Sequence, residues 1–308
     1  MSTALSVPRG AARPRARVGT PFRSQARTGL IMVTPAAAFF AVFFIYPVVN
    51  AVWVSLTSWD LIGPQKFIGI RNYVRLLGDD DFLHAAWVTV AYSGSFLIVT
   101  LPLALGLAVA LDRPMQARGV YQAIIFAPVV LSMVVVAMIW RAVYSPVGGL
   151  YLMFTAPFGL TNIQWLNRED LALPALVVVS IWKNVGYYLV IFLAGLQSIP
   201  ASFYEAARID GAAPSRVFRS ITLPLLKPYI LFALVIGIIR TSQTFSAVYA
   251  LTEGGPNDAT TVLPFLIYQN AFQFNRMGYA SAMAIVMFAA LLVLTVIQFR
   301  LLRSEAGE

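Results

Sequence analysis

Six long apolar runs occur along the 308-residue sequence, and they limit what the chain can fold into. The runs cover residues 29–56, 87–111, 120–143, 171–197, 226–250 and 278–299. Each has about 22 to 28 residues, enough for a helix that rises about 1.5 Å per residue to cross a hydrocarbon layer of about 30 Å. Only 11% of the residues are charged, against about 25% in soluble proteins. The pattern predicts an all-α, polytopic membrane protein with six transmembrane helices.

The regions outside these runs are short, except at the N-terminus. Residues 1–28 are rich in Arg, Pro and Ala and contain six Arg, which is typical of a disordered segment. The first apolar run is longer than the roughly 7 to 15 residues of a cleavable signal-peptide core. We therefore expect a disordered basic tail at 1–28, a six-helix transmembrane domain at 29–300 and a short C-terminal tail at 301–308.

Basic residues are distributed unevenly between the two sets of loops. With the N-terminus inside, the inner segments hold fourteen Lys and Arg residues and the outer loops hold six. Because positive charge concentrates on the cytoplasmic side of membrane proteins, both termini are predicted to be cytoplasmic. The polar stretch 198–225 then faces the cytoplasm. The outer loops 57–86, 144–170 and 251–277 are long enough to carry short helices.

Residues that carry catalytic chemistry are scarce. The chain has no Cys, which excludes thiol catalysis and Cys-ligated metals. It has no Gly-x-x-x-x-Gly-Lys-Ser/Thr phosphate loop, so nucleotide hydrolysis is not expected of it. Its one histidine, His84, lies near the acidic residues 79–81, where a solvated side chain is a simpler interpretation than a metal ligand. We predict no catalytic residue, no metal site and no cofactor bound by this chain.

The charges also bear on the class of protein. The net charge is +9, but the Arg residues gather at the ends of apolar runs instead of on one face, and nucleic-acid binding is not predicted. The six runs contain no Asp or Glu, whereas ion-coupled carriers usually place carboxylates inside the membrane. The pattern favours a transport protein that is energised by another subunit. Two alternatives stay open: an ion-coupled secondary transporter, and a membrane-embedded transferase that uses acids at 79–81 or 169–170.

The polar stretch from residue 205 to 224 has the pattern of a helix–turn–helix. Its first helix is expected to start at a capping box, because Ser202 and Glu205 have the required spacing. Asp210 and Gly211 suit the end of that helix, since glycine tolerates a left-handed backbone conformation.

A second helix is expected to follow at once. Pro214 suits its first turn, where the missing N–H of proline is not needed. Leu223 and Pro224 are expected to stop this helix before the fifth apolar run. The resulting rigid element would offer Arg208, Arg216 and Arg219 to a partner.

Two charged residues lie near the middle of apolar runs: Lys183 in the fourth and Arg240 in the fifth. A charge at that depth is costly unless it faces water, polar partners or a ligand. Amides, hydroxyls and aromatic rings flank both residues; such groups suit a polyhydroxylated ligand, and they also hydrogen-bond neighbouring helices. The candidate pathway residues are Trp182, Lys183, Asn184, Tyr187, Arg240, Gln243, Thr244, Ser246 and Tyr249.

The polar stretch carries a motif that resembles a known family. Glu-Ala-Ala at 205–207, Gly211 and Ile-x-Leu-Pro at 221–224 reproduce the EAA-x3-G-x9-I-x-L-P loop of the membrane-spanning permeases of carbohydrate-type ABC importers, the maltose and glycerol-3-phosphate group. Residues 182–200 resemble the family's fourth span, and 252–261 resemble its T-x-G-G-P outer loop. The resemblance extends over about residues 29–300 and implies the type I ABC importer permease fold.

The resemblance implies a non-enzymatic transport subunit of the bacterial inner membrane. Its partners would be two cytoplasmic ATP-binding subunits, one homologous permease subunit, an extracytoplasmic solute-binding protein and membrane lipid, but no nucleic acid. ATP and Mg would bind to the partner ATPase and not to this chain. The loop 198–225 would dock on the ATPase. The implied coupling residues are Glu205, Ala206, Ala207, Arg208, Asp210, Gly211, Arg216, Leu223 and Pro224.

Two departures from the family pattern lie in the fifth span. Ser246 follows Phe245 where relatives commonly have Asp, and Arg240 stands where an uncharged residue is usual. The expected cargo is a sugar or oligosaccharide, because aromatic rings stack on sugar faces while hydroxyls find donors and acceptors. The alternative cargo is an anion, such as a glycerophosphodiester or a glycerol-3-phosphate-like molecule, which Arg240 and Lys183 suit by charge-assisted hydrogen bonds.

Overall fold

The protein is described by a computed structural model. It describes residues 22–113, 115–147, 149–150, 157 and 163–305. The chain divides into two units, 1–50 and 51–308.

The described part of the first unit, residues 22–50, is helical. Helix α1 (Phe22–Phe40) continues through a π-helical turn, η1 (Ala41–Ile45), into the start of α2 (Tyr46–Ser55). The apolar part of this run extends from Thr28 to Ser55, in agreement with the first predicted span. The prediction of a disordered tail is wrong for residues 22–28, because Arg, Gln and Ala favour helix and extend it toward the N-terminus. The rest of the tail lies outside the described residues.

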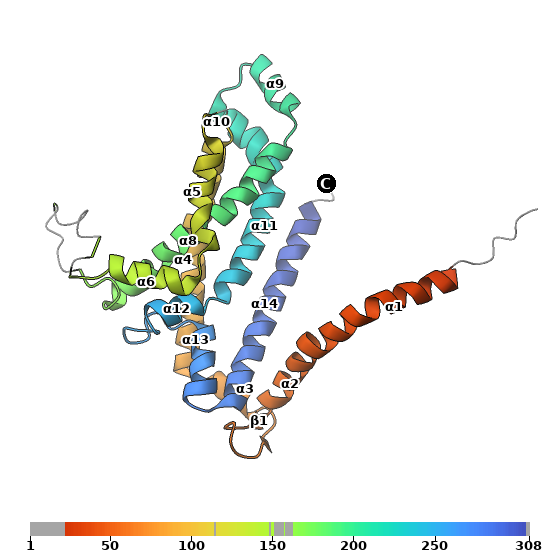
Figure 1. Cartoon of the computed structure of the whole chain (residues 1–308), viewed down its shortest axis with the longest axis vertical. Coiled ribbons are helices and arrows are strands. Elements are labelled where there is room, and N and C mark those ends of the chain that lie inside the picture. The colour runs from red at the N-terminus through yellow and green to blue at the C-terminus, as the bar shows by residue number, and fades with distance from the viewer. Residues whose placement is uncertain (1–21, 114, 148, 151–156, 158–162, 306–308) are drawn as a thin grey trace, which may run out of the picture. The chain divides into compact units, whose positions relative to one another are not determined.

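The second unit contains a small hairpin and a set of helices (Figure 1). Its elements are β1 (Thr57–Ser58), β2 (Lys66–Phe67), α3 (Arg71–Leu76), α4 (Asp80–Leu111), α5 (Arg118–Val130), α6 (Met133–Val143), α8 (Glu169–Ser198), α9 (Ala201–Ile209), α10 (Pro214–Val217), η3 (Phe218–Thr222), α11 (Leu223–Ser242), α12 (Ser246–Leu251), α13 (Leu263–Tyr268), η4 (Gln269–Gln273) and α14 (Met277–Glu305). The two strands pair antiparallel, with Thr57 opposite Phe67.

Helices α4 and α8 pack together at the centre of the second unit, and α11 packs against both. Phe96 of α4 meets Tyr188 of α8 with 6.1 Å between ring centroids, and both side chains are almost fully buried. The hydroxyl of Tyr92 donates to Oγ of Ser180 across the same interface, at 2.8 Å. Lipid tails are as apolar as the helices, so close packing and such interhelical hydrogen bonds hold the bundle together.

The number of spans agrees with the sequence only if one broken helix pair is counted as a span. Within the described residues, five helices are long and apolar enough to cross a membrane, and the pair α5–α6 would make six. The five cover Thr28–Ser55, Asp80–Leu111, Glu169–Ser198, Pro214–Ser242 and Met277–Gln298.

The predicted continuous span 120–143 is wrong. The chain bends by 100° between α5 and α6, where Leu131 and Ser132 are extended with ψ of 144° and 140°. Pro128 lies in the last turn of α5 and has no N–H to donate back along the helix. The helix ends two residues after this proline, at Val130, and α6 runs across the bundle instead of along it (Figure 1).

The predicted stop at Leu223 and Pro224 is also wrong. Helix continues from Pro214 through the π-helical turn η3 into α11, which ends at Ser242. In this turn the amide of Leu223 donates to the carbonyl of Phe218, five residues back. The wider turn gives room for the ring of Pro224, which in a regular helix would clash with the carbonyl four residues before it.

The outer loops are partly helical, as expected. The loop 57–86 carries the β1–β2 hairpin and α3, and 251–277 carries α13 and η4, whereas residues 148, 151–156 and 158–162 of the loop 144–170 lie outside the described residues. Helix α4 starts earlier than predicted, because the side chain of Asp79 caps it by accepting from the amide of Phe82. At the other end of the chain, α14 continues to residue 305, so the predicted C-terminal tail is largely helical.

The close approach of α8 to α5 allows a test of the packing. A Cβ at Gly186 would lie 2.4 Å from the carbonyl oxygen of Ile125, a backbone atom that cannot move aside. We expect Gly186→Ala to destabilise the protein by about 1–3 kcal/mol, as overpacking does. Gly94→Ala in α4 is the matched control, because nothing lies within 4 Å of that position. Thermal unfolding in detergent should show a lower Tm for Gly186→Ala only; equal Tm values for both variants would contradict the close packing.

Candidate functional site

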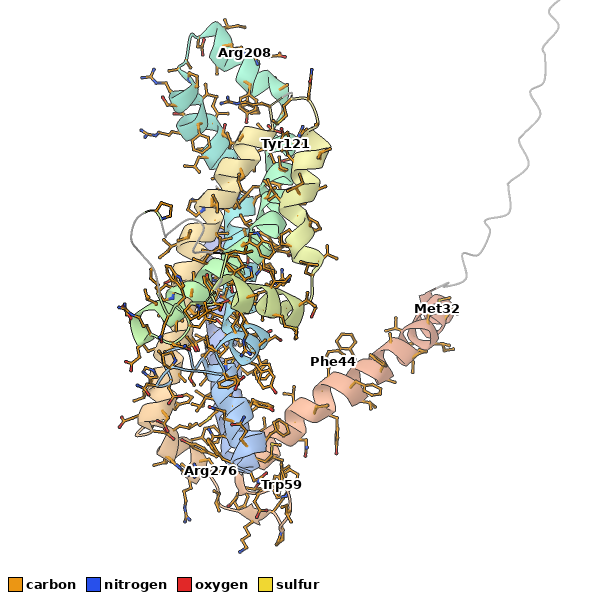
Figure 2. The ribbon with its side chains drawn as sticks, turned by 60° about the vertical axis from the view of Figure 1, so that its left-hand side comes forward. Met32, Phe44, Trp59, Tyr121, Arg208 and Arg276 are labelled. Carbon is orange, nitrogen blue, oxygen red and sulfur yellow. The ribbon has the colours of Figure 1, made fainter. Side chains whose placement is uncertain are left out.

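The helix–turn–helix lies at one end of the second unit, where Figure 2 labels Arg208. Asp210 ends α9, and Gly211 follows with a φ of +66°. The amide of Ala212 donates to the carbonyl of Ala207 at 3.0 Å, and the amide of Gly211 donates to that of Arg208 at 3.1 Å. These two bonds form a Schellman motif, which satisfies carbonyls that a helix end otherwise leaves unbonded. The predicted turn at Asp210 and Gly211 is confirmed.

The start of α9 differs from the predicted capping box. Pro200 is the N-cap residue, with ψ of 134°, and Ser202 lies inside the first turn of the helix. The ψ of Pro200 is not helical, so the helix begins directly after it, and the Ser202 side chain is too late in the sequence to cap. Glu205 then lies in the second turn, exposed to solvent.

The turn presents charged side chains from an anchored backbone. Ala207 is buried, and the hydroxyl of Tyr204 lies 3.2 Å from Oγ1 of Thr222, which connects α9 to η3. The predicted coupling residues Glu205, Ala206, Arg208, Asp210, Gly211 and Arg216 are all exposed.

A groove of about 480 Å³ lies between α9 and α10. Phe203, Ala206 and Val217 contribute apolar surface, and Asp210 and Arg216 contribute charges of opposite sign. An apolar centre with a polar rim is typical of a protein–protein contact. Five of the nine predicted coupling residues do not line this groove: Glu205, Arg208, Gly211, Leu223 and Pro224. The last two belong to the first turn of α11.

A cavity of about 280 Å³ lies among α4, α6, α8, α11 and α12. Six of the nine predicted pathway residues line it: Lys183, Asn184, Arg240, Gln243, Thr244 and Ser246. The structure therefore brings together residues from two apolar runs that are far apart in the sequence.

Two interruptions of the helices meet at this cavity. Met133 at the start of α6 follows the bend after α5, and residues 243–245 separate α11 from α12. Non-helical backbone at membrane depth is tolerated only where protein buries it or where it lines a water-filled space. Helices α6 and α12 pack against each other, and Arg141 joins them by donating from Nε to the carbonyl of Leu251 at 3.2 Å.

The two cations of the cavity differ in their contacts. Nζ of Lys183 donates to the carbonyl of Val129 at 3.1 Å, a group that the bend after α5 leaves without a helical partner. The guanidinium of Arg240 lies 4.6 Å from the ring centroid of Tyr187, a cation–π contact. No carboxylate is among the described residues that line the cavity. The cavity is therefore electropositive.

The other three predicted pathway residues do not line the cavity. Trp182 packs against Trp140 with 5.7 Å between ring centroids. Tyr187 lies beneath Arg240. Tyr249 belongs to an aromatic cluster with Phe245, from which its ring centroid is 5.3 Å.

Sequence reasoning missed further residues that line the cavity, among them Tyr92, Ser180 and Tyr188. Tyr92 lies in the second apolar run, where a polar hydroxyl among apolar side chains could have identified it as a candidate. Ser180 and Tyr188 lie close in sequence to Lys183, and their place in the cavity follows from the face of α8 that they share with Asn184.

Comparison with known proteins identifies relatives over most of the chain. The family model of binding-protein-dependent transport system inner membrane components matches residues 101–305. The trehalose/maltose transport system permease protein MalF of Thermococcus litoralis is 36% identical over 279 residues, which cover 90% of this chain and 94% of that protein. The sn-glycerol-3-phosphate transport system permease protein UgpA of Escherichia coli is 35% identical over 279 residues, which cover 89% of this chain and 94% of that protein.

A solved structure shares the fold. One chain of a bacterial alginate ABC transporter, crystallised with an alginate pentasaccharide-bound periplasmic protein, superposes with a TM-score of 0.80. The two chains are 25% identical, and the match covers 91% of this chain and 96% of the other. These matches confirm the predicted all-α permease fold.

Gly211 offers a test of the helix–turn–helix. Gly211 has a left-handed backbone conformation, which is less stable by about 1–2 kcal/mol for residues that have a Cβ. We therefore expect Gly211→Val to weaken the Schellman motif and fray the end of α9. Hydrogen exchange at the amides of residues 211 and 212 should become about tenfold faster or more. Ala213→Val is the matched control, because Ala213 is exposed and extended, with φ of −62° and ψ of 147°. Equal exchange in the two variants would show that the turn does not depend on glycine.

Proposed function

Because the chain belongs to the family of binding-protein-dependent transport system inner membrane components, we propose that it is one of two homologous permease subunits that form the pathway of an ATP-driven importer. Two ATP-binding subunits on the cytoplasmic side would hold ATP and Mg and carry out hydrolysis. A solute-binding protein would deliver the cargo on the other side. Family membership favours this function over an ion-coupled carrier or a membrane-embedded transferase.

One continuous helix supports the coupling mechanism. The helical run from Pro214 to Ser242 has 29 residues, about 43 Å at 1.5 Å per residue. It begins at the exposed α9–α10 turn and ends at the cavity, which Arg240 and Gln243 line. A force on the turn therefore acts on the cavity without a flexible joint between them. We infer that ATP-driven closure of the ATPase subunits moves this helix and changes access to the cavity.

The α9–α10 turn is the proposed docking element. Glu205 and Arg208 are exposed on α9 and would make polar contacts with the ATPase subunit, while the groove beside Phe203 would bind apolar side chains. The Schellman motif at Gly211 keeps the two helices in a fixed relation, so that little conformational entropy is lost on docking. Docking on a cytoplasmic ATPase subunit requires the turn to lie in the cytoplasm, and the distribution of Lys and Arg predicts the same side for both termini.

A sugar or oligosaccharide is the proposed cargo. The hydroxyls of Tyr92, Ser180 and Thr244 and the amides of Asn184 and Gln243 line the cavity, which offers both donors and acceptors to a polyhydroxylated ligand. MalF, a trehalose/maltose permease protein, supports this class. A second candidate is an anionic cargo, which the pair Lys183 and Arg240 favours because the described lining has no carboxylate to neutralise it.

Reconstitution tests the function directly. The permease pair and ATPase subunits in liposomes, with the binding protein added outside, should accumulate sugar only when ATP is enclosed. Uptake driven by an ion gradient in the absence of the ATPase subunits would establish a secondary transporter instead.

Charge reversal at Glu205 tests docking. Loss of a buried charged contact at an interface costs 2 kcal/mol or more, so Glu205→Lys is expected to reduce coupled ATP hydrolysis and uptake by about 30-fold or more. Asp81→Lys is the matched control, because Asp81 is an exposed acid at the far end of α4. Normal transport by Glu205→Lys would remove Glu205 from the docking contact.

Substitution of Arg240 separates the two cargo classes. A hydrogen bond to a charged group contributes about 1.5–3 kcal/mol, so Arg240→Gln should reduce uptake of a phosphorylated or carboxylated sugar by about 10-fold or more and that of a neutral sugar much less. Arg240→Lys, which keeps the charge, should retain most of the anion transport. Equal losses for both cargoes in Arg240→Gln would exclude recognition of charge at this position.

A further inference from the structure

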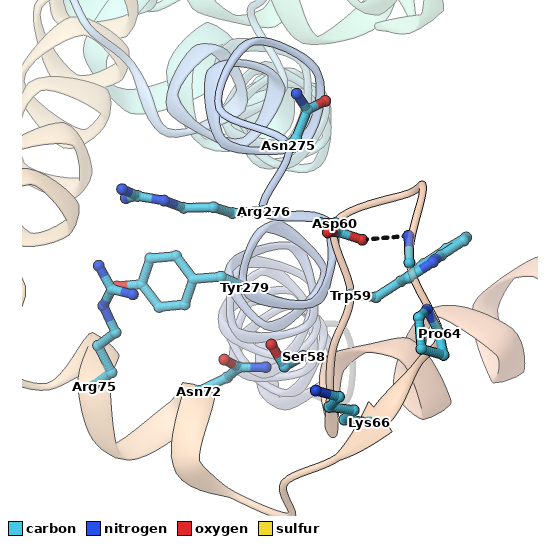
Figure 3. Close-up of a pocket in the computed structure, with 11 residues that line it drawn as sticks. Ser58, Trp59, Asp60, Pro64, Lys66, Asn72, Arg75, Asn275, Arg276 and Tyr279 are labelled. Atoms are coloured by element: carbon cyan, nitrogen blue, oxygen red, sulfur yellow. Dashed lines mark hydrogen bonds between the residues drawn. The ribbon is translucent and has the colours of Figure 1, made fainter.

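A second polar pocket lies at the end of the second unit opposite the α9–α10 turn (Figures 2 and 3). It measures about 340 Å³ and is bounded by the β1–β2 hairpin, α3 and the start of α14. Three cations line it, one from each of these elements: Lys66, Arg75 and Arg276. The transport mechanism proposed above does not use this pocket.

The walls of the pocket are held in place by close backbone contacts. The amide of Gly278 donates to the carbonyl of Trp59 at 3.3 Å, and a Cβ at Gly278 would lie 2.0 Å from the carbonyl oxygen of Thr57. Nδ2 of Asn72 donates to the carbonyls of Ser55 and Thr57, at 2.8 and 3.0 Å. Only glycine permits this approach of α14 to the hairpin, so the pocket is a built feature of the fold.

The ring of Tyr279 contacts one of the cations of the pocket. The guanidinium of Arg75 lies 4.5 Å from the ring centroid of Tyr279, whose hydroxyl donates to the carboxylate of Asp79. Figure 3 shows Arg276 next to Tyr279 in the same pocket. Within the described part of the chain, none of the three cations takes part in an ion pair.

Asp60 is the one carboxylate in the described lining of the pocket. It accepts from the amides of Gly63 and Ile62, at 2.7 and 3.3 Å. The pKa of Asp60 is lowered from its ordinary value, mainly by the bond from Gly63, so the carboxylate stays ionised at neutral pH. Both bonds are accepted by Oδ1 of Asp60, and the three cations of the described lining exceed this one carboxylate by two charges.

We propose that this pocket is a docking site for a carboxylate side chain of the solute-binding protein. The inference rests on the proposed function, under which the end opposite the ATPase-docking turn faces the binding protein. Paired guanidinium groups recognise carboxylates by charge-assisted hydrogen bonds. The hairpin loop that carries Asp60 and Lys66 is polar and lies beyond the ends of α3 and α14 (Figure 1), which favours a water-borne partner over a lipid headgroup.

Charge-neutralising variants test the docking site. The complete transporter would be placed in nanodiscs of phosphatidylcholine, and binding of the purified solute-binding protein of the same system, loaded with its sugar, would be measured at several NaCl concentrations. Arg276→Gln and Lys66→Gln should each weaken binding by about 5- to 10-fold at low salt, and should reduce the dependence of Kd on salt. Lys66 lies on an exposed strand, so this variant stays informative if Arg276→Gln impairs folding.

Arg71→Gln is the matched control, because Arg71 is an exposed residue of α3 outside the pocket lining and its loss changes the net charge equally. It should change Kd by less than about twofold. Equal effects of Arg71→Gln and the two pocket variants would overturn the proposal, since general charge would then explain the binding. An effect of Arg276→Gln that arises only when phosphatidylglycerol is added would assign the pocket to lipid and also overturn it.

The stimulation of ATP hydrolysis by the binding protein separates this inference from the proposed function. No stimulation of the wild-type complex would contradict the function itself. Normal stimulation of the wild type, with unchanged Kd in Arg276→Gln and Lys66→Gln, would contradict only the docking pocket.

Discussion

Backbone N–H and C=O groups at membrane depth find no water, so each must bond within the protein. Long helices meet this requirement along most of the second unit. The exceptions are the bend between α5 and α6 and the three residues between α11 and α12, and both adjoin one cavity. At the first of these, Lys183 donates to the carbonyl of Val129 that the bend leaves unbonded. This hydrogen bond offsets part of the free-energy cost of the unbonded carbonyl at the bend, beside the polar cavity.

The same requirement explains why the helix from Pro214 to Ser242 is continuous although it contains Pro224 and Pro228. The π-helical turn η3 widens the helix before Pro224 and relieves the clash of its ring. A complete break there would separate the α9–α10 turn from the cavity mechanically. With the break absent, one rigid element joins the surface proposed to bind an ATPase subunit to the residues proposed to contact cargo.

Positive charge serves different purposes at three levels of the second unit. At the α9–α10 turn, Arg208 and Arg216 lie on the surface beside acidic residues. In the cavity, Arg240 lies against an aromatic ring with no carboxylate in the described lining. At the opposite end, Arg75 and Arg276 surround Tyr279 in a pocket that glycine contacts hold open. Arg240, Arg75 and Arg276 take part in no ion pair within the described part of the chain, and the two proposals for an anionic ligand, the second candidate for the cargo and the docking pocket, rest on them.

The sequence by itself determined the membrane class, the approximate spans and the turn at Gly211, because these depend on local properties: the length of apolar runs and the backbone freedom of glycine. It also identified residues of the cavity, since charged and amide side chains are conspicuous in apolar runs. Tertiary structure decided the rest. Pro128 marks a bend and Pro224 does not, because the outcome depends on what surrounds each proline: Lys183 bonds the carbonyl of Val129 at the bend, whereas η3 accommodates the ring at Pro224. Which side chains face the cavity, and the pocket formed by Lys66, Arg75 and Arg276, depend on contacts between segments far apart in the chain, and no local pattern encodes them.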